Sequence, residues 1–183
     1  PVIGLAPGQP MCRILIVDDL ADNRAPLRAL LNGLNPQSPV LEFREAANGQ
    51  EAVAIWEAWQ PHVIFMDMRM PVLSGEEATR RIKAQIATRP ETVRSVIVAL
   101  TASAFNENRD HFLACGCDEF ARKPFVAEEL FVILELCAGL QFIRAGELPA
   151  QEEPLSADTI ATRLVTQPEA WRVTLKEAVD LGD

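Results

Sequence analysis

The sequence contains no lysine- or arginine-rich run and no long apolar run. Basic residues number 17 against 26 acidic ones, which gives a formal net charge of -9 at pH 7. Because nucleic-acid-binding modules usually display basic patches, this charge balance excludes nucleic acid as a partner. The apolar run Leu130–Leu134 is ended by Glu135, and no stretch approaches the ~20 residues that a membrane-spanning helix needs. The segment also has no signal-peptide pattern, so we expect it to make no membrane contact.

Cysteine and histidine are both scarce. The four cysteines are Cys12, Cys115, Cys117 and Cys137, and the two histidines are His62 and His111. Cys115 and Cys117 are too close together for an ordinary zinc-binding pair, and neither histidine stands at zinc-ligand spacing. We therefore interpret the cysteines as structural or incidental residues in a reducing cytosol, which predicts a cytoplasmic location.

Short apolar runs alternate with helical patterns along most of the chain. Its 183 residues, 49% of them hydrophobic and 23% charged, are enough for one domain with a real core and an appendage. The pattern predicts strands over 13–17, 40–45, 62–66, 95–100 and 118–121, each followed by a helix, the last three helices over about 75–87, 107–114 and 126–140. Five such units in succession indicate a doubly wound α/β fold with a five-stranded parallel sheet. The flavodoxin-like strand order 2-1-3-4-5 is usual at this size.

Composition changes at both ends of this alternation. Glycines and prolines make residues 1–12 typical of a linker, and the domain itself extends over 13–142. Residues 143–183 are interpreted as an acidic connector and a short helical tail. Because the chain begins with Pro1 instead of methionine, we expect it to be a segment of a larger protein.

Polar side chains stand at the ends of the predicted strands. Asp18 and Asp19 follow the first strand, Asp67 follows the third, Thr101 follows the fourth and Lys123 follows the fifth. Ligands of an open parallel sheet bind outside the carboxyl ends of its strands, so these five side chains are expected to converge. Three carboxylates attract a hard dication, whereas a lysine and a hydroxyl face an anion. The combination favours transfer of a phosphoryl group.

The same residues have the chemistry that such a transfer needs. Mg²⁺ takes oxygen ligands and prefers one or two carboxylates together with water and phosphate. A carboxylate such as that of Asp67 can act as a nucleophile toward phosphorus and form an aspartyl-phosphate. Lys123 and Thr101 can then pair with the phosphoryl oxygens. No general base is needed because a carboxylate is already ionised at neutral pH.

Four strings in this chain resemble response-regulator receiver domains. They are Ile14–Asp19, Val63–Pro71 with Gly75, Ala99–Ser103, and Lys123–Phe125. The resemblance covers roughly residues 13–140. It implies that Asp67 is the phosphoacceptor and that Asp18 and Asp19 are the magnesium-binding pair. It also implies that the main-chain carbonyl of Arg69 binds the metal.

The resemblance implies switch roles as well. Thr101 matches the switch hydroxyl, and Lys123 matches the phosphate-facing lysine, whose bond to Pro124 is cis in the family. The aromatic switch position, three residues before the lysine, is Phe120 instead of the frequent tyrosine. We expect the coupling between the threonine and the aromatic ring to persist with altered surface polarity.

Two further positions flank the approach of a hydrolytic water in this family. They are Arg69, two residues after Asp67, and Ser103, two residues after Thr101. Arg69 cannot act as a base, and Ser103 has no carboxamide or carboxylate to orient water. We therefore expect slow self-dephosphorylation.

The resemblance implies that the domain takes a phosphoryl group from a phosphohistidine and switches conformation. The donor is a histidine kinase domain, a histidine phosphotransfer protein, or both. The domain is an enzyme only in catalysing its own phosphorylation and dephosphorylation. Residues 2–10 resemble the linker of bacterial hybrid sensor kinases. We therefore expect the C-terminal receiver of a hybrid histidine kinase, whose catalytic domain lies outside this segment. A membrane-anchored parent is compatible with this expectation.

Other functions stay open at this point. The first alternative is a stand-alone response regulator whose helical tail is a protein-binding output. A magnesium-dependent hydrolase is disfavoured, because Met68 and Arg69 stand where its second acid is needed. A receiver that only mediates association is disfavoured by retention of all five site residues. The tail contains no histidine and so cannot be a phosphotransfer module. The resemblance leaves homodimerisation open.

Overall fold

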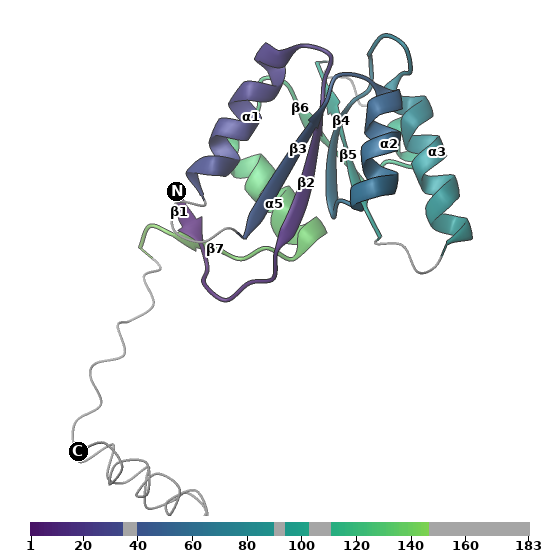
Figure 1. Cartoon of the computed structure of the whole chain (residues 1–183). Helices are drawn as coiled ribbons and strands as arrows, with labels where there is room; N and C mark the ends of the chain where they lie inside the picture. The colour runs from purple at the N-terminus through teal and green to yellow at the C-terminus, as the bar shows by residue number, and fades with distance from the viewer. Residues whose placement is uncertain (35–39, 90–93, 103–110, 147–183) are drawn as a thin grey trace, which may run out of the picture. The chain divides into compact units, whose positions relative to one another are not determined.

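The structure, a computed structural model, describes residues 1–34, 40–89, 94–102 and 111–146. A central sheet is covered by helices on both faces (Figure 1). The strands of this sheet are β2 (Cys12–Val17), β3 (Leu41–Ala46), β4 (Val63–Asp67), β5 (Val96–Thr101) and β6 (Glu119–Arg122). The helices are α1 (Ala21–Gly33), α2 (Gly49–Trp59), α3 (Gly75–Thr88) and α5 (Ala127–Ala138). Residues 111–114 are also helical.

The five strands are parallel and lie in the order β3-β2-β4-β5-β6. In order of appearance along the chain these are strands 2-1-3-4-5, so the expected flavodoxin-like fold is confirmed. Each strand begins and ends within one or two residues of the range that the apolar runs predicted. Parallel strands covered on both faces read as continuous apolar runs, and Ile14–Val17 and Val63–Met66 are completely buried.

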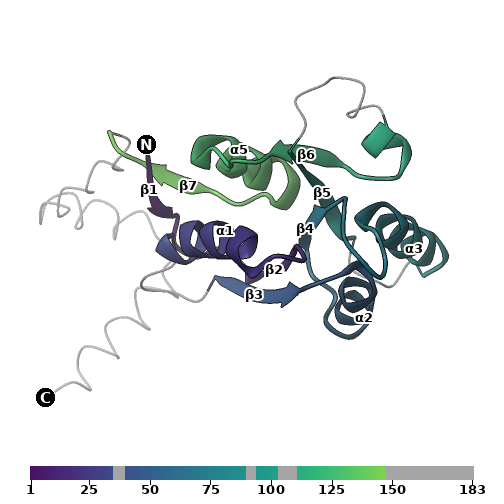
Figure 2. The ribbon, with the colours of Figure 1, turned by 90° about the horizontal axis from the view of Figure 1, so that it is seen from above.

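Two apolar clusters hold the helices against the two faces of the sheet. Leu31 of α1 and Leu134 of α5 belong to one cluster, and Trp56 of α2 and Ile82 of α3 belong to the other. Figure 2 accordingly shows α1 and α5 on one face and α2 and α3 on the opposite face. Burial of large apolar side chains on both faces is the main stabilising contribution to this arrangement.

The segment that we interpreted as a linker contains a strand, β1 (Val2–Leu5). It pairs in antiparallel fashion with β7 (Phe142–Arg144), which follows α5. The side chain of Gln9 adds to this pairing, since its Nε2 donates to the carbonyl of Gln141 and its Oε1 accepts from the backbone N–H of the same residue. The sequence did not predict this pairing, because a three- or four-residue strand depends on a partner far away in the chain. Pro1–Ala145 form one compact unit.

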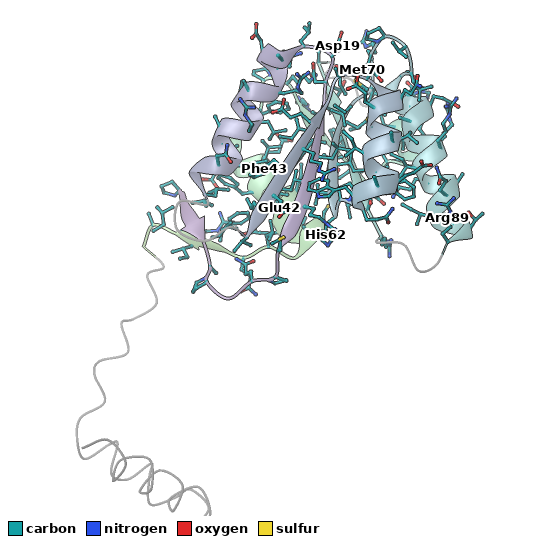
Figure 3. The ribbon with its side chains drawn as sticks, viewed as in Figure 1. Asp19, Glu42, Phe43, His62, Met70 and Arg89 are labelled. Atoms are coloured by element: carbon teal, nitrogen blue, oxygen red, sulfur yellow. The ribbon has the colours of Figure 1, made fainter. Side chains whose placement is uncertain are left out.

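Strand register brings the polar strand ends to one edge of the sheet. Val17 pairs with Met66, Asp67 pairs with Leu100, and Thr101 pairs with Arg122. The residues that follow each strand therefore emerge side by side. Figure 3 shows Asp19 at this edge and His62 at the opposite end of the sheet.

Candidate functional site

Three carboxylates gather at the carboxyl edge of the sheet. Oxygens of Asp18, Asp19 and Asp67 all lie within 4.8 Å of one another. Asp18 is buried, Asp19 is exposed, and the Asp67 side chain is 16% exposed. This set offers only oxygen ligands and is open on one side, and these are the properties that a hard cation such as Mg²⁺ requires.

Lys123 faces two of these carboxylates. Its Nζ contacts Oδ2 of Asp18 and lies 3.2 Å from Oδ2 of Asp67. Its backbone N–H donates to the carbonyl of Thr101 at 2.9 Å, which fixes the lysine beside the end of β5. The peptide bond to Pro124 is cis, as the resemblance implied. One cation is thus shared by two acids that come from different strand ends.

Asp18 is held in place by contacts that the sequence analysis did not identify. Its Oδ1 accepts from the backbone N–H of Leu20 and from Nδ2 of Asn23, each at 2.9 Å. Its carbonyl accepts from Arg24, whose Nε also pairs with Glu45 at 2.8 Å. Their place in the sequence could have identified these residues, because Asn23 and Arg24 lie in the first turn of the helix that follows the acidic pair.

Burial raises the pKa of Asp67 above its ordinary value of 3.8. The charge of Lys123 and the backbone N–H of Arg69, which donates to Oδ1 at 3.3 Å, oppose this shift, whereas Asp18 adds to it. The low polarity around Asp67 therefore outweighs the neighbouring cation. A partly desolvated carboxylate with a cation beside it is a suitable nucleophile for an anionic phosphoryl group.

A cleft of about 640 Å³ opens over these groups. Its walls include five of the side chains singled out from the sequence: Asp19, Asp67, Arg69, Thr101 and Lys123. Asn23, Met68, Ala102 and Phe112 are among the other residues of the walls and had not been expected there. Ser103 lies outside the described residues.

Phe120 lies away from the cleft wall. It is in β6 opposite Ala99 and packs against the apolar cluster on the α2–α3 face. Side chains alternate along a strand, so Ala99 and Thr101 share a face of β5, and Phe120 belongs to that same face. The ring is thus placed on the side of the sheet toward which Thr101 points.

The model of the response regulator receiver domain family matches residues 14–135. The chain belongs to this family. A receiver domain is the phosphate-accepting part of a two-component phosphorelay, and this chain is such a domain. The oxygen-only acidic set and the lysine beside Asp67 agree with that assignment.

Relatives of this receiver domain occur in plants, fungi and bacteria. The two-component response regulator ORR41 of Oryza sativa is 38% identical over 126 residues, which cover 68% of this chain and 92% of that protein. The osmolarity two-component system protein SSK1 of Saccharomyces cerevisiae is 32% identical over 137 residues. These cover 63% of this chain but only 18% of SSK1, so the chain spans a small part of that relative.

Two solved structures are similar in both sequence and fold. One is the Saccharomyces cerevisiae Ssk1 receiver domain in a co-crystal with the histidine phosphotransfer protein Ypd1, at 34% identity and a TM-score of 0.62. The match covers 70% of this chain and 90% of that one. The other is the receiver domain of the sensor histidine kinase PA1611 of Pseudomonas aeruginosa, with magnesium in its active-site cleft. It is 36% identical, with a TM-score of 0.60, over 70% of this chain and 98% of that one. Within the described part of this receiver, no helix is long and apolar enough to cross a membrane.

Proposed function

We propose that Asp67 of this receiver accepts the phosphoryl group. The observation that carries the proposal is the position of its carboxylate, 3.2 Å from Lys123 and within 4.8 Å of Asp18 and Asp19, in one cleft. Asp67 ends β4, which lies between β2 and β5 in the sheet, and its main chain is held by pairing with Leu100 of β5. Such fixed positions favour a reaction that depends on alignment of nucleophile and phosphorus.

The reaction is an in-line transfer from a phosphohistidine. An oxygen of Asp67 forms the new bond to phosphorus while the bond from phosphorus to the imidazole nitrogen breaks. The electron pair of that bond stays with the imidazole, which takes up a proton. Lys123 pairs with a phosphoryl oxygen, and the hydroxyl of Thr101 donates to another.

We propose Mg²⁺ as the cofactor, held by Asp18, Asp19, Asp67 and the carbonyl of Arg69. When bound, the ion neutralises charge on the phosphoryl oxygens. Charge balance supports this assignment, since three carboxylates face the single ammonium of Lys123 and leave an excess of two negative charges. The magnesium described in the PA1611 receiver is a further argument.

The test uses purified protein with Mg²⁺ and acetyl phosphate, followed by intact mass. We expect one added phosphoryl group on the parent and none on Asp67→Asn. Asp22→Asn is a matched control, because Asp22 lies outside the acidic set on the first turn of α1. A phosphorylated Asp67→Asn protein would reject Asp67 as the acceptor.

We propose a histidine phosphotransfer protein, or a kinase domain that carries the phosphohistidine, as the partner. A groove of about 420 Å³ between α1 and the start of α5 shares Asn23, Lys123 and Pro124 with the acidic cleft. Pro26, Leu30 and Phe125 line it, so its surface is largely apolar. A donor seated there has its imidazole close to Asp67. The co-crystal of Ypd1 with the Ssk1 receiver supports a partner of this kind.

Docking of the partner can be tested separately from the chemistry of the site. We expect Leu30→Asp to slow transfer from a phosphotransfer protein while leaving phosphorylation by acetyl phosphate unchanged. Leu136→Asp is the matched control, because Leu136 is 78% exposed on α5 and does not line the groove. Equal transfer rates for parent and Leu30→Asp would place the docking surface elsewhere.

We also propose that Thr101 and Phe120 couple phosphorylation to a change at the α2–α3 face. Their location on the same side of adjacent strands supports this. Structures of the Mg²⁺-bound receiver with and without a phosphoryl mimic test it, and an unmoved Phe120 ring rejects it.

Arg69 and Ser103 are proposed to make self-dephosphorylation slow. Arg69 is an exposed residue on the cleft wall and has no group that can accept a proton from water. The double variant Arg69→Asn, Ser103→Glu is expected to lose its phosphoryl group faster than the parent. An unchanged half-life, followed by intact mass, would count against both positions.

We propose that this receiver belongs to a hybrid histidine kinase and works in the cytoplasm. The similarity to the receiver of a sensor histidine kinase supports the first point, and four free cysteines support the second. Sequencing the complete reading frame tests the first, and fractionation of cells that produce the whole protein tests the second.

A further inference from the structure

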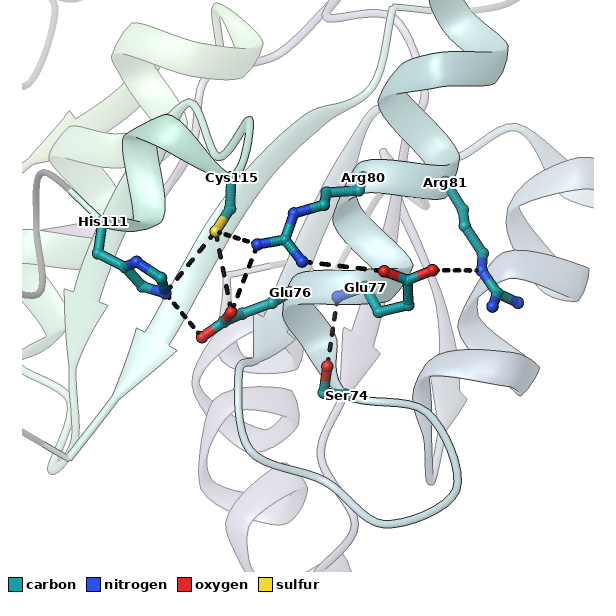
Figure 4. A network of polar contacts seen from close by, with 7 residues as sticks. All are labelled: Ser74, Glu76, Glu77, Arg80, Arg81, His111 and Cys115. Atoms are coloured by element: carbon teal, nitrogen blue, oxygen red, sulfur yellow. Dashed lines mark hydrogen bonds and ion pairs between the residues drawn. The ribbon is translucent and has the colours of Figure 1, made fainter.

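A second cluster of metal-ligating side chains lies outside the acidic cleft. It contains Glu76 of α3 together with His111 and Cys115, and one ligand atom of each lies within 4.8 Å of the others. Nε2 of His111 lies 3.0 Å from Oε1 of Glu76 and 3.8 Å from Sγ of Cys115. Sγ of Cys115 lies 3.9 Å from Oε2 of Glu76. Figure 4 shows the three side chains converging from two elements.

Helical spacing explains why two of these ligands face the same point. His111 and Cys115 are four residues apart, and the backbone N–H of Cys115 donates to the carbonyl of His111 at 3.0 Å. Residues at this spacing lie one above the other on a helix face. We had expected neither histidine to stand at zinc-ligand spacing, but His111 lies on the same helix face as Cys115 and close to Glu76. The third ligand, Glu76, comes from another helix, so spacing along the chain does not indicate the whole set.

We propose that Glu76, His111 and Cys115 bind a zinc ion. Nitrogen, sulfur and oxygen ligands together suit zinc better than magnesium or calcium, which prefer oxygen alone. Tetrahedral ligands at ordinary zinc bond lengths are roughly 3.4 to 3.6 Å apart. His111 and Cys115 are 3.8 Å apart, and they lie 3.0 Å and 3.9 Å from the two carboxylate oxygens of Glu76, so only small side-chain movements are needed.

Burial and exposure also fit a metal site at the surface. Cys115 is buried, whereas the side chains of Glu76 and His111 are 29% and 51% exposed, which leaves an approach from solvent. Binding replaces the proton of the Cys115 thiol by the metal and releases that proton to solvent. The ionised thiol and the Glu76 carboxylate then balance the two charges of the zinc ion. Water takes the fourth position.

Arg80 is the competing cation in this cluster. Its Nη2 lies 3.3 Å from Sγ of Cys115 and 3.7 Å from Oε2 of Glu76. Its Nη1 also lies 3.8 Å from Glu77, so the guanidinium has a second carboxylate to pair with when zinc is bound. Because this substitution removes the competing charge, Arg80→Gln should bind the metal more tightly than the parent.

The site would join α3 to the helical residues 111–114. Glu76 follows Gly75, at which an added Cβ would overlap the carbonyl oxygen of Asp67. The metal would thus be anchored on the helix turn that packs directly against the phosphoacceptor strand.

Cobalt is the probe that tests this site. Co²⁺ is titrated into the purified chain in millimolar Mg²⁺, which occupies the acidic cleft, and the thiolate-to-cobalt charge-transfer band is recorded. We expect one equivalent to produce the band and Zn²⁺ to abolish it. Cys115→Ser should lose the band, and His111→Gln and Glu76→Gln should weaken Co²⁺ binding by about tenfold or more. Cys137→Ser and Asp67→Asn should keep it.

A second measurement covers the case in which Cys115→Ser does not fold. Zn²⁺ should raise the thermal unfolding midpoint of the parent and of Arg80→Gln, because the three ligands converge only in the folded chain. It should have no such effect on His111→Gln, whose substitution is at a half-exposed side chain. Absence of the cobalt band in the parent, a band that survives in Cys115→Ser, or loss of the band in Asp67→Asn would overturn the proposal.

Discussion

The ammonium group of Lys123 lies 3.2 Å from the carboxylate of Asp67 and also contacts Asp18. Asp18 is 105 residues away from this lysine in the chain. Parallel register at the carboxyl edge of the sheet brings the three together. The lysine reduces repulsion between the two acids in the absence of a ligand. In the proposed function it also faces a phosphoryl oxygen once Asp67 is phosphorylated.

Replacement of Lys123 by methionine keeps the apolar stem and removes this charge. The pKa of Asp67 should rise further, because the charge of Lys123 lowers it in the parent. Phosphorylation by acetyl phosphate should slow by about a hundredfold, as expected when one preorganised donor to a phosphoryl oxygen is lost. Carboxyl titration by NMR and intact mass provide the two readouts. Lys83→Met is the control, because Lys83 pairs with Asp118 at 2.5 Å and takes no part in the site; equal effects of both substitutions would contradict a specific role for Lys123.

Stability without metal should depend on the ionisation of Asp67. Burial raises its folded pKa above the value in the unfolded chain, so the fold favours the protonated form. This contribution is fully present below pH 3.8 and is lost as the pH rises through the folded pKa. In chelator, Asp67→Asn should therefore be more stable than the parent at neutral pH, with a difference that disappears in acid. Thermal unfolding across this pH range checks the sign, and a parent that gains stability over the variant as the pH rises would refute it.

Gly75 should tolerate no side chain. An added Cβ would meet the main chain of Asp67 and the side chain of Met66, so Gly75→Ala must displace α3 or the end of β4. We expect a loss of about 2 kcal/mol in the free energy of unfolding. Gly33→Ala is the matched control, because nothing lies within 4 Å of its added Cβ and alanine favours the helix. Urea unfolding of the two variants should shift in opposite directions.

The thiols should differ in reactivity according to burial. Burial raises the pKa of Cys12 and of Cys117 to about 11, which leaves little of the reactive thiolate at pH 8. Cys137 on α5 is only partly buried, and its pKa is raised as well. In a Cys115→Ser background, a disulfide reagent should label Cys137 first, and the other two thiols should react only on unfolding. Peptide mass mapping assigns the labels, and early modification of Cys12 would contradict the expected protection.

The local pattern of the sequence was enough to predict most of the fold. Apolar runs such as Ile14–Val17 identified the strands, because strands buried on both faces have no polar position along their length. The starts of α2 and α3 are also determined by nearby residues, because the side chains of Asn48 and Ser74 each accept a hydrogen bond from the backbone N–H three residues later. By contrast, the β1–β7 pair was missed, because a short strand has no signal apart from its distant partner.

By itself, the sequence determined the strand ends and therefore which edge of the sheet holds Asp18, Asp67 and Lys123. All strands of a parallel sheet run in the same direction, so their carboxyl ends lie at one edge of the sheet. Only the tertiary structure decided the contacts of Asn23 and Arg24 with Asp18, and the meeting of Glu76 with Cys115. Such contacts depend on helix packing and side-chain direction, which distances along the chain do not specify.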